Sequence, residues 1–240
     1  MDKLLHGDCF EMMANLPNES IDCILADLPF GITQAKWDCE LPLDKLWTEY
    51  KRLAKPHCPI VLFASQPFTS KLITSNLEMF KYCWYWEKEK GTGFLNAKHQ
   101  PLRCVEEICV FYTKGKYNPQ MVPLEKPYRH KLPTLASETI NSVASFDAEI
   151  VYKEYTHSYP KNLLKFSRDN ANKGVHSTQK PLDLLEYLVS TYSNVGDVIL
   201  DNTMGSGTTC AAAKKLGRGY IGIEKDKEMF EIACERINSH

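Results

Sequence analysis

The stretch GDVILDNTMGSGTTCAAAKKLGRGYIGIEKD, residues 196–226, carries the strongest fold signal in the sequence. The apolar run DVILD is followed by a turn that contains Gly205 and Gly207, an alanine-rich helical segment, and a second apolar run. Glycines at these places permit a tight turn and a close approach of a ligand to the backbone. The stretch therefore predicts a strand–helix–strand unit with a ligand site at its first turn.

Two acidic residues flank this turn and indicate the kind of ligand. Asp201 precedes the turn, and Glu224 lies 19 residues beyond Gly205, where such a unit places an acceptor for ribose hydroxyls. The turn lacks the third glycine of the dinucleotide fingerprint and the lysine of a P-loop. Negative charge on both sides disfavours a polyphosphate and suits S-adenosylmethionine, which has an amino group and a free ribose. The alternative is a turn that serves tight packing alone.

Length and composition limit the class of protein. The 240 residues, 43% hydrophobic and 25% charged, correspond to one soluble globular domain or to one domain with a sizeable insertion. The sequence has neither an apolar run long enough to span a bilayer nor an N-terminal signal segment, so we expect a cytoplasmic protein without membrane contact. Nine scattered cysteines without a Cys-x-x-Cys pair predict buried thiols, and no metal site.

Strand and helix patterns alternate along most of the chain. Apolar runs at 21–26 and 59–65 frame an amphipathic helix at 41–55, and the pattern resumes at Pro181. This alternation predicts an α/β fold with a doubly wound, mostly parallel sheet. Trp84 and Trp86 alternate on a further strand, and we expect them in the core.

The stretch from 115 to 173 interrupts this alternation and shows no sustained period. Between Tyr112 and Lys173 ten Lys or Arg stand against six Asp or Glu, although the whole chain has a net charge of −1. A locally basic segment on a near-neutral body is typical of a nucleic-acid contact, and a solvated loop is the alternative. We therefore divide the chain into an α/β domain, 1–114 and 174–240, and an insertion, 115–173.

The stretch ILADLPFGIT, residues 24–33, ends a buried strand with residues that suit amine chemistry. Asp27 and the carbonyl of Leu28 can accept hydrogen bonds from an exocyclic base amine, whose nitrogen is otherwise a poor nucleophile. Pro29 restricts Leu28 to an extended conformation, and Phe30 can stack on a base extruded from its helix. The alternative is a turn-capping Asp27 and a core Phe30.

These motifs resemble those of the beta-class S-adenosylmethionine-dependent DNA amino-methyltransferases, which modify adenine N6 or cytosine N4. Asp27-Leu28-Pro29-Phe30 is similar to their catalytic motif, with leucine in place of its first proline. The order of catalytic motif, basic insertion and cofactor loop is that of the beta class. The resemblance implies a circularly permuted, Rossmann-like methyltransferase fold with a target-recognition region at 115–173, and it covers most of 4–113 and 174–237.

The resemblance also implies cofactor contacts, residue by residue. HGDCFEMM resembles the segment that contacts the cofactor adenine, which nominates Asp8. HSTQKPLDLLEYL resembles the segment that grips the methionine end, and Lys180 would bind the cofactor carboxylate there. The remaining cofactor positions implied by the matching motifs are His176, Thr178, Asp201, Gly205, Gly207, Thr208 and Glu224.

The function expected from this resemblance is site-specific methylation of adenine N6 in double-stranded DNA. A homodimer and a companion restriction endonuclease are further partners that the family allows. Cytosine N4 methylation is the nearest alternative, although Asp in the position of Asp27 is more typical of the adenine enzymes. A DNA-binding relative without catalysis is a second alternative. A nicotinamide-dependent dehydrogenase is disfavoured by the missing third glycine and by the Asp27–Phe30 motif.

Overall fold

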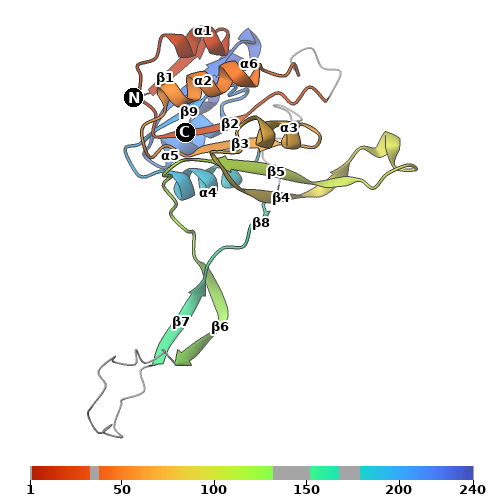
Figure 1. Ribbon diagram of the computed structural model, residues 1–240, viewed down its shortest axis with the longest axis vertical. Coiled ribbons are helices and arrows are strands. Elements are labelled where there is room, and N and C mark those ends of the chain that lie inside the picture. The colour runs from red at the N-terminus through yellow and green to blue at the C-terminus, as the bar shows by residue number, and fades with distance from the viewer. Residues whose placement is uncertain (1, 33–37, 132–151, 168–178, 240) are drawn as a thin grey trace, which may run out of the picture. The chain divides into compact units, whose positions relative to one another are not determined.

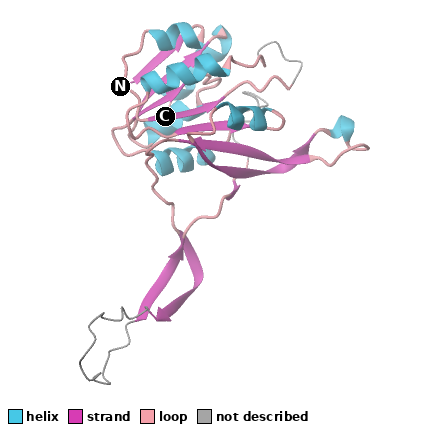
Figure 2. Ribbon diagram, in the orientation of Figure 1, coloured by secondary structure: helices cyan, strands magenta, loops and turns pink. Residues whose placement is uncertain are grey.

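The computed structural model describes residues 2–32, 38–131, 152–167 and 179–239, and it forms two compact units. The first unit comprises 1–118 and 161–240, and the second comprises 119–160. The first unit contains an eight-stranded sheet with helices on both faces (Figures 1 and 2). The prediction of a doubly wound α/β fold is thus confirmed.

The elements of the first unit are bounded as follows. Its described helices are α1 (Cys9–Ala14), α2 (Leu43–Leu53), α3 (Phe68–Ser75), α4 (Leu182–Tyr192), α5 (Thr208–Lys215), α6 (Lys227–Asn238) and a 3₁₀ turn, η1 (Phe94–Asn96). Its strands are β1 (Asp2–His6), β2 (Cys23–Asp27), β3 (Ile60–Ala64), β4 (Phe80–Thr92), β5 (Arg103–Phe111), β8 (Leu163–Lys165), β9 (Val198–Asp201) and β10 (Gly219–Glu224).

The strand order is β1-β10-β9-β2-β3-β5-β4-β8. Every strand except β5 runs in the same direction, because β5 pairs antiparallel with both β3 and β4. The carboxyl ends of β10, β9, β2 and β3 consequently lie along one edge of the sheet, which we call the carboxyl edge. Open α/β sheets bind their ligands at this edge.

Helices cover both faces of the sheet, which explains why its central strands β2 and β3 are apolar almost throughout. Ile24 and Ala26 of β2 pack on the side of α1, α2 and α3, whereas Cys23 and Leu25 pack on the side of α4, α5 and α6. A strand buried on both faces needs no polar alternation. Trp84 and Trp86 are 3% and 1% exposed, so both belong to the core as expected.

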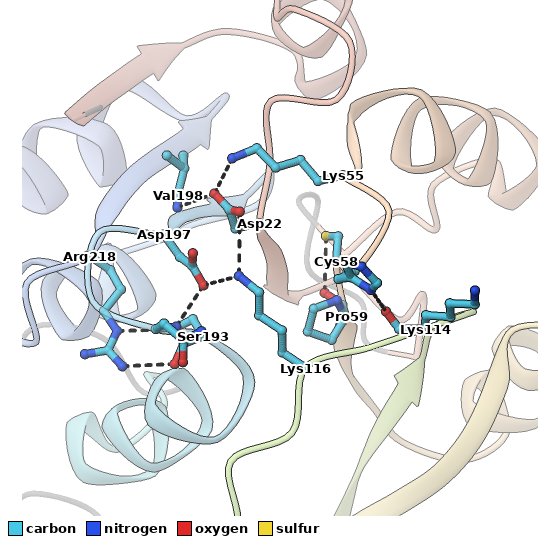
Figure 3. A network of polar contacts seen from close by, with 12 residues as sticks. Asp22, Lys55, Cys58, Pro59, Lys114, Lys116, Ser193, Asp197, Val198 and Arg218 are labelled. Carbon is cyan, nitrogen blue, oxygen red and sulfur yellow. Dashed lines mark hydrogen bonds and ion pairs between the residues drawn. The ribbon is translucent and has the colours of Figure 1, made fainter.

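The opposite edge of the sheet, its amino edge, is held by ion pairs (Figure 3). Asp22, directly before β2, binds Lys55 at 2.7 Å and accepts the backbone N–H of Val198 at 3.0 Å. Lys116, which follows β5, binds Asp197 at 2.6 Å. Asn118 donates to the carbonyl of Ser193 at 3.1 Å. These contacts fix the chain to the α/β unit just before it enters the second unit.

The second unit is an antiparallel hairpin of β6 (Val122–Lys131) and β7 (Tyr152–Ser158). The rings of Tyr128 and Tyr155 stack across it with centroids 5.2 Å apart. The hairpin lies where the sequence shows no sustained period. Most described side chains of β6 and β7 are exposed, and strands without a buried face need no apolar alternation. β8, from the same part of the sequence, pairs with β4 in the main sheet.

Within 2–32, 38–131, 152–167 and 179–239, no helix has the length and apolarity needed to cross a membrane.

Candidate active site

Three neighbouring strands of the carboxyl edge each end in an acidic residue singled out by the sequence. Asp27 ends β2, Asp201 ends β9 and Glu224 ends β10, in the sheet order β10-β9-β2. Two motifs separated by some 170 residues of sequence thus meet at one edge. This arrangement brings three carboxylates to the ends of adjacent strands at the carboxyl edge.

The corner formed by Asp27, Leu28, Pro29 and Phe30 is rigid on one side and open on the other. Leu28 is buried in the core at 3% exposure, and the ring of Phe30 stacks on that of Phe68 at 5.5 Å. The Asp27 side chain is 35% exposed. The corner therefore combines two well-packed side chains, those of Leu28 and Phe30, with an accessible carboxylate, that of Asp27.

Thr203 connects the corner to the cofactor loop. Its hydroxyl donates to the backbone carbonyl of Asp27 at 3.1 Å, and its backbone N–H donates to Asp201 Oδ1 at 3.2 Å. Thr203 thereby links the ends of β2 and β9.

A buried row of charges supports Asp27, and sequence reasoning missed half of it. Lys180 Nζ lies 2.6 Å from Asp27 Oδ2 and 2.8 Å from Glu106 Oε1, and Lys88 lies 2.9 Å from Glu106 Oε2. Glu106 is an unusual charged residue in a strand otherwise buried toward its end. Glu106 stands beside Glu107 at the start of an apolar run, and this local pattern does not indicate its partners, because they come from distant elements.

The charged groups in this row shift one another's pKa values. Burial alone would lower the pKa of Lys180, but Asp27 and Glu106 outweigh it and raise that pKa above its ordinary value. Burial alone would raise the pKa of Glu106, but Lys180 and Lys88 outweigh it and lower that pKa. For Asp27, burial raises the pKa and Lys180 opposes the rise. Lys180 is thus the cation that favours an ionised Asp27.

The glycines of the cofactor loop serve different purposes. Both adopt left-handed backbone conformations, with φ +51° at Gly205 and +75° at Gly207. A methyl group at Gly207 would stand 2.9 Å from Ile237 and 3.1 Å from Ala233 of α6, so this glycine permits helix packing. A methyl group at Gly205 would meet no atom within 4 Å. Gly205 therefore borders open space at the carboxyl edge.

Acidic side chains hold the loop beside this open space. Glu224 accepts the N–H of Gly205 at 2.9 Å and that of Asp226 at 2.8 Å. Asp201 is 3% exposed, and its burial raises its pKa from 3.8 to about 7, although hydrogen bonds from Thr209 and Thr203 oppose the rise. An open backbone position between two carboxylates fits a ligand with an amine and ribose hydroxyls.

Of the other predicted cofactor residues, Asp8 and Thr208 lie at the starts of helices. Asp8, two residues beyond β1, accepts the N–H of Phe10 at 3.0 Å and so caps α1. Thr208 begins α5, and its hydroxyl accepts a hydrogen bond from Arg236 at 2.8 Å. His176 and Thr178 lie outside the described residues.

Comparisons with known proteins agree with this geometry. The family model N6_N4_Mtase, described as DNA methylase, matches residues 21–235. The chain is 29% identical to the type II methyltransferase M.HpaI of Haemophilus parainfluenzae, over 99% of this chain and 74% of that protein. It is 28% identical to the type II methyltransferase M1.MboII of Moraxella bovis, over 99% and 97% of the two chains.

Two solved structures extend the comparison to the fold. The crystal structure of the M1.HpyAVI–SAM complex superimposes with a TM-score of 0.65 at 26% identity, covering 99% of this chain and 100% of that chain. The cytosine-N4-specific PvuII DNA methyltransferase gives a TM-score of 0.70 at 16% identity, covering 97% and 85%, and shares the fold.

The sheet has the Rossmann-like fold of the methyltransferases. The chain belongs to the N6/N4 DNA methylase family. It is a DNA amino-methyltransferase that uses S-adenosylmethionine as its cofactor.

Proposed function

We propose that the protein methylates the exocyclic N6 amine of an adenine extruded from double-stranded DNA. The observation that carries this proposal is the accessible Asp27 carboxylate at the end of β2, next to the Leu28 carbonyl and on the same edge as Asp201 and Glu224. A carboxylate in this position is more typical of the adenine members of the family than of the cytosine members.

The residues of the corner would act by polarising the amine. The lone pair of an exocyclic amine is delocalised into the base, and hydrogen bonds accepted from both of its N–H groups increase its electron density. Asp27 Oδ1 and the Leu28 carbonyl are the two acceptors that we assign, since Asp27 Oδ2 contacts Lys180. Phe30 would stack on the extruded base. The cofactor supplies the methyl group.

We assign Lys180 to the positioning of Asp27. This differs from the role implied by the family resemblance, in which Lys180 binds the carboxylate of the cofactor. Its ammonium lies between two carboxylates, those of Asp27 and Glu106, and is 11% exposed. A cation held in this way orients Asp27 and opposes the rise in its pKa that burial causes, which favours the ionised form that accepts hydrogen bonds.

We assign the cofactor to the remaining part of the carboxyl edge. Gly205 and Gly207 shape the loop, Asp201 and Glu224 supply acceptors, and Asp8 and Thr208 flank the site. His176 and Thr178 complete the set that the family resemblance implies. The open position at Gly205 supports this assignment.

We assign duplex tracking to the insertion 115–173. The β6–β7 hairpin has exposed Tyr128 and Tyr152, 54% and 58% exposed, among basic residues such as Arg129 and Lys153. Lysine and arginine would contact phosphates, and polar side chains would read base edges. The type II methyltransferase relatives support a restriction-modification setting with a companion endonuclease.

Identification of the methylated nucleoside tests the proposal. The protein would be incubated with labelled S-adenosylmethionine and duplex DNA from a methylation-free host, and the digested product would be analysed by mass. We expect N6-methyladenine, and none from an Asp27→Ala variant that still binds the cofactor. Label in N4-methylcytosine, or equal product from the variant, would overturn it.

A further inference from the structure

The β4–β5 hairpin extends beyond the carboxyl edge of the sheet (Figure 1). β4 runs in the same direction as β2 and β3, and its regular pairing with β5 continues through Trp86, which faces Glu106, to Glu87. Beyond Glu87 the strand continues to Thr92, about five residues or roughly 16 Å of extended chain. Because Glu106 pairs with Lys180, which contacts Asp27, this arm begins beside the proposed amine-holding corner.

The tip of this arm, which comprises the ends of β4 and β5 and the turn between them, contains a short 3₁₀ helix (Figure 2). Gly93 adopts a left-handed conformation, φ +94°, and leads into η1. Backbone N–H groups of Asn96 and Ala97 donate to the carbonyls of Gly93 and Phe94 at 3.0 and 3.1 Å. Below the tip, a methyl group at Gly91 would stand 2.8 Å from Leu102 Cβ, so the two strands pack closely there.

This tip exposes two adjacent large apolar side chains. Phe94 is 69% exposed and Leu95 is fully exposed. Single exposed apolar residues are common on protein surfaces, but two of them at the end of a projecting arm cannot reach the protein's own core. Phe94 and Leu95 can therefore insert into a narrow apolar gap on a binding partner.

Charges on the arm indicate the chemistry of that partner. Lys90, Lys98 and Arg103 are exposed around the tip. Of the acidic residues on the same arm, Glu89 is exposed, and Glu87 is paired with Lys165 at 2.9 Å. This excess of positive charge complements a polyanion. A two-residue apolar tip is also much smaller than the roughly 800 Å² per partner of a stable protein interface. Apolar wedges of this size, flanked by cations, are what proteins insert between DNA base steps.

We propose that the tip of the β4–β5 hairpin is a second DNA-contacting element, with Phe94 and Leu95 as an apolar wedge and Lys90 and Lys98 on phosphates. The inference rests on the proposed function, because it takes duplex DNA as the substrate at the carboxyl edge. A wedge beside the corner would unstack the duplex near the target and so favour extrusion of the base.

Paired variants test the wedge. Phe94→Ala/Leu95→Ala is compared with Leu77→Ala, a control leucine that is 64% exposed and lies before β4, at its amino end. We expect the double variant to raise the KM for DNA from a methylation-free host about tenfold, the effect of losing a stacking contact. The Leu77→Ala variant keeps the wild-type KM, and both variants keep the wild-type affinity for S-adenosylmethionine.

A second pair of substitutions tests the cations. Binding to a labelled mixed-sequence duplex is measured at a series of salt concentrations. The slope of log affinity against log salt should be shallower for Lys90→Ala/Lys98→Ala by the equivalent of about two phosphate contacts. Unchanged KM in the wedge variant together with an unchanged salt slope in the lysine variant would overturn the inference. Loss of self-association in the wedge variant by sedimentation would also overturn it, in favour of an interface between copies of this chain.

The identity of the product separates this inference from the proposed function. If the wild-type protein methylates cytosine N4, the adenine assignment fails while the wedge measurements stand. If the product is N6-methyladenine and the wedge variant behaves as Leu77→Ala does, only the wedge is wrong.

Discussion

Asp201→Asn should make the protein more stable at neutral and alkaline pH in the absence of cofactor. Asp201 is buried at the end of β9, and this burial raises its pKa from 3.8 to about 7. The folded protein therefore binds a proton that the unfolded chain releases between these two pH values. Stability falls as pH rises through this window and levels off above about pH 7, which is the sign for an acid with a raised folded-state pKa. An asparagine at this position removes the dependence.

The magnitude follows from the size of the pKa change. At about 1.4 kcal/mol per pH unit, the ionisation of Asp201 destabilises the fold by about 4 kcal/mol above pH 7 and by about 1.5 kcal/mol near pH 5. The difference in unfolding free energy between Asp201→Asn and wild type should thus grow by about 3 kcal/mol from pH 5 to pH 8. Urea unfolding of both proteins at a series of pH values measures it, and any constant packing cost of asparagine cancels.

A pH-independent difference between the two proteins would refute this reasoning. It would mean that Asp201 is ionised throughout, with hydrogen bonds from Thr203 and Thr209 sufficient to replace water. The matched measurement is the affinity for S-adenosylmethionine by calorimetry. If Asp201 accepts a hydrogen bond from the cofactor, wild-type affinity rises as pH increases through about 7, and the asparagine variant loses that rise.

Other substitutions separate stability from chemistry. Gly205→Ala should lower stability by only about 1–2 kcal/mol while weakening cofactor binding, whereas Gly207→Ala should lower stability further because its methyl group meets α6; urea unfolding and calorimetry distinguish the two. Lys180→Met should cost about 3 kcal/mol of stability and shift the acid limb of the methylation pH profile to higher pH, since Asp27 loses its cation; an unmoved limb would contradict the role of Lys180. Leu28→Ala should cost about 2–5 kcal/mol in urea unfolding without changing cofactor affinity, and a normal stability would contradict its burial.

The fold was predictable because the apolar runs are long and separated by clear turn residues. DVILD and GYIGIEKD became β9 and β10, and the predicted helix at 41–55 is observed as Leu43–Leu53. The insertion was less predictable. Strands β6 and β7 have no buried face, so no apolar alternation reveals them.

The motif residues of the site were predictable, but the residues that hold them in place were not. Asp27, Asp201 and Glu224 follow apolar strands, and the sheet rule brings them to one edge. Glu106 and Thr203 could not be assigned roles in the same way. Each acts through a contact with a residue distant in sequence, and no local pattern records such a contact.

The strand order has a consequence for synthesis of the chain. β1 and β2 are consecutive in sequence, but β10 and β9 lie between them in the sheet. On the ribosome, the apolar edge of β2 therefore stays without its neighbour β9 until nearly all of the chain has emerged. Such long-range pairing slows folding and leaves the nascent chain dependent on protection from aggregation. It also means that a translation product truncated before β9 lacks the strands that carry Asp201 and Glu224.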